Sequence, residues 1–252
     1  MKKVLERILF YALLIAAWGL VARAGFLPAR VLPSPRSVLL SLWGGFQDGS
    51  IPAALFMSLK RIVIGYVVSV VGGILMGAMI GRYARAENTF GSLILGLQTL
   101  PSLCWMPAAL LWFGPTDAAI IFVVVMGSVF SIAISTLDGV RNIPPRYLQA
   151  ARSMGSRGWH LYTDVIVPAT LPAIAQGLKQ AWTFAWRSLL GGELLFVTLG
   201  LGNLLQSGRQ NNNISLVAAV MVLITLIGLG ADRLLFSPIE KHVRARWGLD
   251  RN

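Results

Sequence analysis

Three charged side chains interrupt a long apolar stretch of the sequence and offer its clearest chemistry. Lys179, Arg187 and Glu193 all lie within residues 172–197. A charge inside a membrane is costly, so such residues usually face protein or water. At 1.5 Å per residue of helix, Arg187 lies roughly 22 Å from the start of this stretch, nearest to mid-depth. Lys179 is shallow enough to extend its ammonium group to the surface.

Arg187 is the strongest candidate for a contact with an anion. Its planar guanidinium can bind an oxyanion through two parallel hydrogen bonds. The residues predicted to line a path for a small anion are Trp182, Trp186, Arg187 and Glu193. The alternative for Arg187 is a structural role, in an ion pair or in a hydrogen bond to unwound backbone near Gly191 and Gly192.

Other reactive side chains are few and scattered. His160 and His242 are far apart, which argues against a metal site, and Cys104 lies in an apolar stretch where a thiol is inert. No catalytic triad or pair of carboxylates stands out, so we predict no catalytic residue. The sequence also lacks a Gly-rich loop ending in Gly-Lys-Ser or Gly-Lys-Thr. We therefore expect this chain to bind no cofactor, and any energy that it uses must come from a partner or an ion gradient.

The composition sets the class of protein. Of 252 residues, 56% are hydrophobic and 13% charged, with a net charge of +12. This excludes a disordered chain, which is poor in apolar residues, and one cysteine excludes a disulfide scaffold. An ordinary soluble domain has about a quarter of its residues charged. The sequence therefore predicts a polytopic membrane protein, and because its apolar stretches do not alternate with polar residues, an all-α one rather than a barrel.

Apolar stretches long enough to cross a bilayer predict six transmembrane helices in a single domain over residues 1–252. They lie at about residues 8–24, 62–80, 93–113, 118–137, 172–197 and 214–236. The third is less regular because it contains Pro101 and Pro107, and the fifth because of its charges. In the second, Gly73 and Gly77 share one helical face, which favours close packing against another helix.

The distribution of Lys and Arg predicts the orientation. Most of the 22 basic residues fall in segments that share the side of the N-terminus, so both termini are expected to be cytoplasmic. The excess of basic residues is therefore explained by the orientation of the chain in the membrane and by contact with anionic lipid, rather than by binding to nucleic acid. Lys2, Lys3 and the first apolar run also resemble a cleavable signal peptide, which would leave five spans in the same orientation.

The segment between the first two spans is expected outside. Residues 32–35, Leu-Pro-Ser-Pro, form an extended opening, and apolar residues then recur at helical spacing over residues 37–46. The pattern predicts a short amphipathic helix at the outer interface, or alternatively a surface for a partner. Lys60 and Arg61 are assigned to this outer segment.

The longest inner loop covers residues 138–171 and carries the strongest signal. A helix is expected over residues 147–154, ended by Gly155, with Ala150 and Ala151 as a flat surface for a partner. Ser156 is expected to cap a second helix over residues 157–165, which Pro168 ends. Long ordered loops are usually functional.

The same loop resembles the EAA signature of ABC importer permeases. That signature reads Glu-Ala-Ala, three residues, Gly, nine residues and Ile-x-Leu-Pro; here Gln149-Ala150-Ala151 is followed by Gly155 and by Val-Ile-Val-Pro at residues 165–168. Gln149 replaces the acidic residue, which removes an ionic contact at this position. Further stretches resemble the nitrate, sulfonate and taurine branch of that family: residues 32–35, 58–61 with Gly65, 111–114, 136–142, and Glu193 with residues 200–202.

This resemblance implies a type I importer permease in a bacterial inner membrane. It implies a homodimer, two cytoplasmic ATPase subunits that bind ATP and Mg, and an extracytoplasmic substrate-binding protein. The loop's first helix would couple to the ATPase through Arg146, Tyr147, Gln149, Ala150, Ala151, Arg152, Met154, Gly155 and Pro168. The solute would be nitrate, a sulfonate such as taurine, or bicarbonate, moved by alternating access; relatives also carry heterocyclic or vitamin-precursor solutes. A gradient-driven carrier is the alternative of another class, and it would need intramembrane carboxylates such as Glu193.

Overall fold

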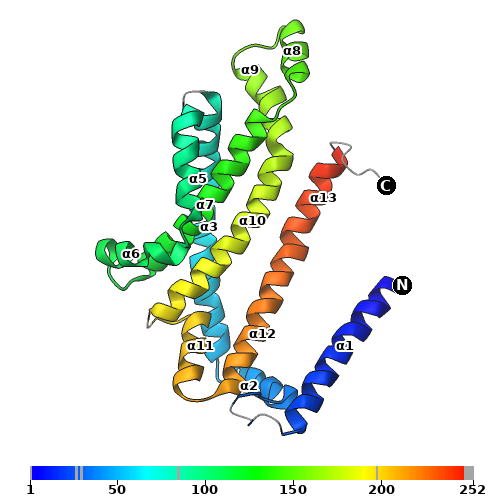
Figure 1. The fold of residues 1–252 in the computed structure, drawn as a ribbon, viewed down its shortest axis with the longest axis vertical. Helices are drawn as coiled ribbons and strands as arrows, with labels where there is room; N and C mark the ends of the chain where they lie inside the picture. The colour runs from blue at the N-terminus through cyan, green and yellow to red at the C-terminus, as the bar shows by residue number, and fades with distance from the viewer. Residues whose placement is uncertain (1, 26–27, 29–30, 84–85, 197, 247–252) are drawn as a thin grey trace. The chain divides into compact units, whose positions relative to one another are not determined.

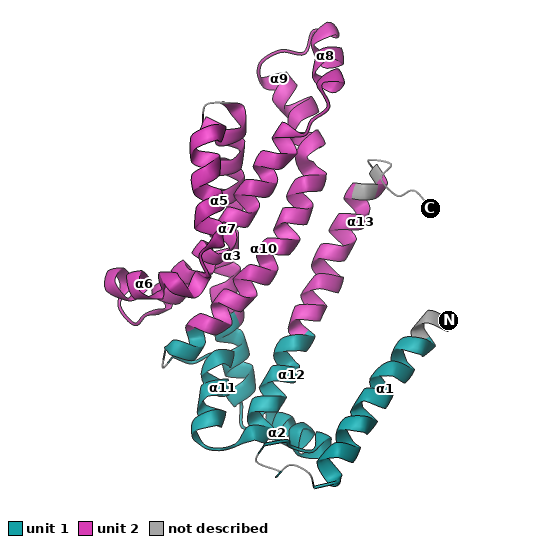
Figure 2. Cartoon of the chain, in the orientation of Figure 1, with its two compact units in different colours: residues 1–58, 193–226 teal, residues 59–192, 227–252 magenta. Residues whose placement is uncertain are grey.

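A computed structural model describes residues 2–25, 28, 31–83, 86–196 and 198–246. Its described secondary structure is entirely helical (Figure 1), as the apolar pattern predicts. The chain divides into two compact units, Met1–Ser58 with Glu193–Leu226 and Leu59–Gly192 with Ile227–Asn252 (Figure 2). Three long helices, α3, α10 and α12, contribute residues to both units. Each unit is described by itself.

The first unit holds the helices nearest the N-terminus and a short helix from the C-terminal half. Its elements are α1 (Lys2–Arg23), α2 (Pro35–Gln47), the beginning of α3 (Ser50–Arg82), the end of α10 (Val167–Leu195), α11 (Leu201–Gln210) and most of α12 (Ile214–Ala231). The short helix expected over residues 37–46 is present as α2. The Ser34 hydroxyl accepts a hydrogen bond from Ser37 N at 3.2 Å, and Pro35 occupies the first turn, which is a stable helix start.

The second unit is built around α7 (Asp117–Arg141), the most buried helix. Its other elements are the rest of α3, a π-turn (Glu87–Gly91), α5 (Ser92–Thr99), a 3-10 turn (Ser102–Trp105), α6 (Met106–Phe113), α8 (Pro145–Ser153), α9 (Trp159–Leu161), a second π-turn (Tyr162–Ile166), most of α10, the end of α12, a third π-turn (Asp232–Phe236) and α13 (Ser237–Arg246). Ile80, Ile94, Val129, Phe130, Ala133 and Leu137 form a buried apolar cluster.

Close packing of α3 against α7 depends on small residues. A Cβ atom at Gly73 would lie 2.7 Å from Ile132 Cβ and 2.8 Å from Val129 O. Next to this contact, Ser128 Oγ lies 2.7 Å from Ser69 Oγ, and both side chains are buried. The glycine face expected from the sequence is thus a helix-packing surface, which lets two backbones approach closely.

The third predicted span is not one straight helix. The helical segments Glu87–Thr99 and Ser102–Phe113 meet at 98°. Leu100, the residue before Pro101, has an extended backbone (φ −70°, ψ 125°), because the proline ring disfavours a helical residue before it. The expected span over residues 93–113 is therefore a bent pair with a break between α5 and α6.

Four helices in the described part of the chain are long and apolar enough to cross a membrane. They are Leu5–Arg23, Ser50–Arg82, Asp117–Arg141 and Ile214–Val243, and the bent pair brings the number to as many as five. The fifth predicted span corresponds to α10, which is not in this group. The second predicted span corresponds to α3, which is longer than predicted and takes in Lys60 and Arg61 from the outer segment. Both residues are helical rather than part of a loop, and Arg61 is buried.

Candidate functional site

The loop helix α8 ends where its glycine predicts. Gly155 has φ +88°, a left-handed conformation that side chains with a Cβ disfavour. Gly155 N donates to Arg152 O at 3.0 Å, and Ser156 N donates to Ala151 O at 2.9 Å. These two bonds satisfy carbonyls at the end of α8 and turn the chain sharply.

One face of α8 is buried and the rest is open. Ala151 is 3% exposed and packs inward, whereas Met154 is 82% exposed. The other predicted coupling residues of this helix are also exposed: Arg146, Tyr147, Gln149, Ala150 and Arg152. The structure therefore places most predicted coupling residues on an accessible surface at one end of the second unit (Figure 2).

The second half of the loop differs from the expectation. Ser156 does not cap a helix; the residue before α9 is Gly158, and the Ser156 hydroxyl is buried without a hydrogen-bond partner among the described residues. Pro168 does not end a helix either, because the chain passes through a π-turn at Tyr162–Ile166 and continues into α10. A wide turn of this kind accommodates the missing N–H of the proline that follows it.

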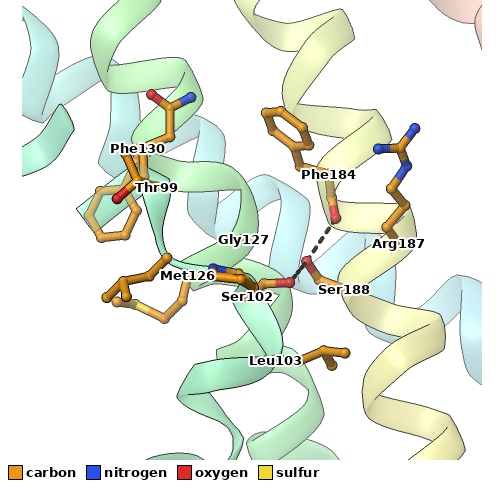
Figure 3. Close-up of a pocket in the computed structure, with 12 residues that line it drawn as sticks. Thr99, Ser102, Leu103, Met126, Gly127, Phe130, Phe184, Arg187 and Ser188 are labelled. Atoms are coloured by element: carbon orange, nitrogen blue, oxygen red, sulfur yellow. Dashed lines mark hydrogen bonds between the residues drawn. The ribbon is translucent and has the colours of Figure 1, made fainter. Parts of the chain in front are cut away.

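Arg187 lies at an open pocket of about 370 Å³ in the second unit (Figure 3). The pocket is formed by α10, α7 and the break between α5 and α6. Its lining includes Thr99, Ser102, Phe130, Phe184, Arg187 and Ser188. Arg187 is exposed, and it has no ion pair or hydrogen-bond partner among the residues that the structure describes. A cation beside hydroxyl groups is well suited to an anion.

The break after Pro101 is held against α10 beside this pocket. Ser188 Oγ lies 2.7 Å from Ser102 Oγ and 2.8 Å from Phe184 O (Figure 3). Opposite them, a Cβ atom at Gly127 would lie 3.0 Å from Ser188 Cβ and 3.1 Å from Ser102 Cβ. The glycine therefore makes room for the serine contact, which fixes one wall of the pocket.

A second pocket of about 580 Å³ lies next to the first, and Gln98 lines both. Its polar lining residues are Gln98, Ser131, Ser135, Asp138, Asn142, Gln176 and Gln180. The Ser131 hydroxyl is buried and lacks a hydrogen-bond partner among the described residues. The two pockets lie along α5, α7 and α10, and we call them together the polar lane after the polar groups that line them.

The two tryptophans of the predicted path do not line these pockets. Trp182 stacks on Trp186, with ring centroids 6.4 Å apart, and packs edge-on against Tyr66 at 5.2 Å. Trp182 also contacts Phe236. Arg187 follows Trp186 and so points about 100° away from it around the helix. The structure therefore separates the aromatic pair from Arg187.

Lys179 pairs with two carboxylates near the end of the chain rather than reaching the surface alone. Its ammonium group lies 3.1 Å from Asp232 Oδ1 and 3.4 Å from Glu240 Oε2. These contacts join α10 to the third π-turn and to α13 within the second unit. Among the described residues, no group of three or more His, Cys, Asp or Glu side chains is arranged to hold a metal.

Glu193 occupies a different environment, buried in the first unit. Its side chain is fully buried and accepts hydrogen bonds from the Ser58 hydroxyl at 2.7 and 2.8 Å and from Gly202 N at 3.0 Å. Ser58 Oγ in turn accepts one from Leu201 N at 2.9 Å. A Cβ atom at Gly200 would overlap the carboxylate. Glu193 thus holds the first turn of α11 against α3.

We expect Glu193→Leu to lower the free energy of unfolding by about 3 kcal/mol, because it leaves the Ser58 hydroxyl and Gly202 N–H buried without their acceptor. Thermal unfolding in detergent measures this change, with L194Q on the same helix as the control. A variant that keeps the wild-type melting temperature but loses transport would instead place Glu193 in the path.

Sequence reasoning missed the ion pair between Arg61 and Asp117 in the second unit. Arg61 is 1% exposed, and its Nη2 and Nε lie 2.6 and 3.0 Å from Asp117 Oδ1. Asp117 is in the first turn of α7, where a carboxylate also favours the helix dipole. The one sequence signal for this position was the apolar character of the segments around Arg61, which could have indicated that its cation lies inside a helix.

The chain is similar to known transport proteins in sequence and in fold. The family model for binding-protein-dependent transport system inner membrane components matches residues 69–236. The chain is 32% identical to a putative aliphatic sulfonates transport permease protein, SsuC, of Escherichia coli, covering 93% of this chain and 88% of that protein. It is 31% identical to a putative ABC transporter permease protein of Methanocaldococcus jannaschii, over 92% and 88%.

A third relative is the nitrate import permease protein NrtB of Synechococcus elongatus, at 26% identity over 96% of this chain and 92% of that protein. Among solved structures, the chain resembles one of the inward-facing MetNI methionine ABC transporter, with a TM-score of 0.55 and 20% identity. The likeness covers 84% of this chain and 97% of the other, and it shows a shared fold.

Proposed function

The chain belongs to the family of binding-protein-dependent transport system inner membrane components, and from this premise we propose that it moves a small oxyanion along its polar lane. It is the permease subunit of an ABC importer, a multi-pass membrane protein and not itself a catalyst. The sulfonate and nitrate permeases among its relatives support an oxyanion such as nitrate, a sulfonate or bicarbonate as the solute.

The position of Arg187 in the first pocket is the main support for an oxyanion as the solute. Arg187 is the one basic side chain that lines either pocket of the polar lane in the described part of the chain, and the neighbouring groups are mostly neutral. A guanidinium at intermediate depth lowers the cost of moving an anion through an apolar slab. The hydroxyl and amide groups of the lane offer weaker, exchangeable hydrogen bonds, which let the solute leave again.

The movement of the ATPase subunits is transmitted to the polar lane through α8. The exposed surface of α8 docks on an ATPase subunit that binds ATP and Mg, and a second permease copy brings a second ATPase. Closure of the ATPases shifts α8 as a rigid element, since Gly155 ends it firmly, and opens the lane to alternate sides. Both termini and α8 face the cytoplasm, and a substrate-binding protein delivers the solute from outside.

A gradient-driven carrier is less consistent with the carboxylates. Coupling to protons or cations requires a carboxylate that can exchange its partner inside the membrane. Glu193 is held by Ser58 and Gly202, and Asp232 is paired with Lys179. Asp138 is exposed and is the carboxylate that lines the polar lane among the described residues, so a carrier would have to use it.

Charge-selective labelling tests the anion path directly. In a Cys104→Ser background, Thr99→Cys places a thiol at the Arg187 pocket. We expect a sulfonate-bearing thiosulfonate reagent to react several times faster than a trimethylammonium one, because Arg187 attracts the anion. Adding Arg187→Gln should abolish this preference, whereas R209Q should keep it. Equal rates for the two reagents in the presence of Arg187 would contradict an anion path.

A further inference from the structure

A third pocket, outside the polar lane, lies between α3, α7 and the base of the α8 loop. It measures about 340 Å³ and its lining is mostly apolar, with Ile74 and Ala78 from α3 and Leu148 from α8. Four residues with polar side chains complete it: Arg82, Thr136, Tyr162 and Thr170, whose hydroxyl donates to Val167 O. The predicted coupling and path residues lie outside its lining.

Arg82 gives this pocket a cation without a carboxylate partner. Its guanidinium lies 5.5 Å from the Tyr162 ring and 5.6 Å from the Tyr83 ring, and it makes no ion pair among the described residues. Arg82 is the last residue of α3, a helix long and apolar enough to span a membrane. A cation in that position lies at the level of lipid headgroups.

Thr136 supplies a second, independent sign that this pocket can bind a ligand. Its side chain is 2% exposed, and its hydroxyl has no hydrogen-bond partner among the described residues. Buried hydroxyl groups are nearly always paired, so an unpaired one that lines a cavity indicates a polar atom of something bound. The ester oxygens of a glycerolipid lie next to its phosphate and could accept this bond.

We propose that this pocket binds one anionic phospholipid. One acyl chain lies along Ile74 and Ala78, and the phosphate pairs with Arg82. The choice of a lipid rests on the combination of an apolar cavity with a cation at the end of a spanning helix, and on the proposed function for its position in the cytoplasmic leaflet, where anionic lipids attract Arg and Lys. A small free anion would leave the apolar part of the pocket unused.

The site has a mechanical consequence, because the lipid contacts the base of the coupling loop. Tyr162 is in the π-turn that joins α9 to α10, and Leu148 is on α8. A lipid between them and α3 braces the loop against the membrane-spanning part. An occupied pocket should therefore support coupling, while an empty one should loosen the connection.

Native mass spectrometry of the purified full chain tests the proposal with phosphatidylglycerol as the probe and phosphatidylcholine as the neutral comparison. We expect wild-type protein to retain one phosphatidylglycerol and Arg82→Gln to bind it about tenfold more weakly. Ala78→Trp, which fills the apolar part, should lower retention similarly. The matched controls are R141Q, which removes an exposed cation paired with Glu87, and M79W, which adds the same ring on the exposed neighbour.

Retention lost in the two pocket variants but kept in both controls supports the lipid site. If R141Q loses as much phosphatidylglycerol as Arg82→Gln, the effect is one of bulk charge and the lipid site is overturned. Retention of phosphatidylcholine equal to that of phosphatidylglycerol would also overturn it. Inorganic phosphate that displaces the lipid completely at millimolar concentration would show a small-anion site instead. Because the measurement uses the permease alone, a negative result leaves the ATPase coupling and the polar lane untouched.

Discussion

Replacing Arg187 with glutamine is expected to lower oxyanion uptake about tenfold or more while the complex with the ATPase still assembles. A charge-assisted hydrogen bond to the solute contributes about 1.5–3 kcal/mol, which corresponds to this loss. Assembly should survive because Arg187 is exposed and contacts no partner among the described residues. Uptake of labelled solute into proteoliposomes measures the first effect, and co-purification of the ATPase measures the second.

Two further variants sharpen this result. Arg187→Lys keeps the charge but not the planar pair of donors, so uptake between the wild-type and Gln levels would show that geometry contributes. Arg209→Gln removes an exposed cation on α11, outside both pockets, and should leave uptake unchanged. If Arg187→Gln instead prevents assembly, the residue is structural and the anion path loses its main support.

The second large effect is expected at Gly155. A Cβ atom there would meet nothing within 4 Å, so the effect of a substitution is confined to the left-handed backbone. Valine is especially unfavourable in this conformation, at a cost of about 1–2 kcal/mol, whereas asparagine adopts it more readily. We expect Gly155→Val to loosen the end of α8 and to release the ATPase in mild detergent, and Gly155→Asn to retain it.

The membrane-spanning part should be insensitive to both Gly155 variants. Their thermal unfolding in detergent is therefore expected to match the wild type, which separates loss of coupling from loss of folding. Full ATPase retention and full uptake in the Val variant would show that the turn after α8 does not transmit the ATPase movement.

Local features of the fold could be predicted from the sequence because their causes are local. Gly155 ends α8 through its own backbone conformation, and Pro35 with Ser34 starts α2. The break before Pro101 has an equally local cause, yet the continuous apolar run from residue 93 concealed it. Hydropathy averages over residues, whereas the pre-proline restriction acts on one residue.

Contacts between distant side chains could not be predicted in this way. Glu193 is 135 residues from Ser58, and Arg61 is 56 residues from Asp117. Periodicity indicates which face of a helix is apolar, but it does not say which helix covers that face. The sequence therefore places Arg61 in the outer segment and gives no sign that Glu193 contacts Ser58 and the start of α11.

ATP hydrolysis on a partner subunit is expected to drive a solute through this permease. The most direct measurement is uptake of a labelled oxyanion into proteoliposomes that contain the permease, its ATPase and the substrate-binding protein, with ionophores present to collapse proton and sodium gradients. We expect uptake to require ATP and the ATPase and to persist without gradients. Uptake that proceeds without the ATPase and stops when the gradients collapse would contradict the account.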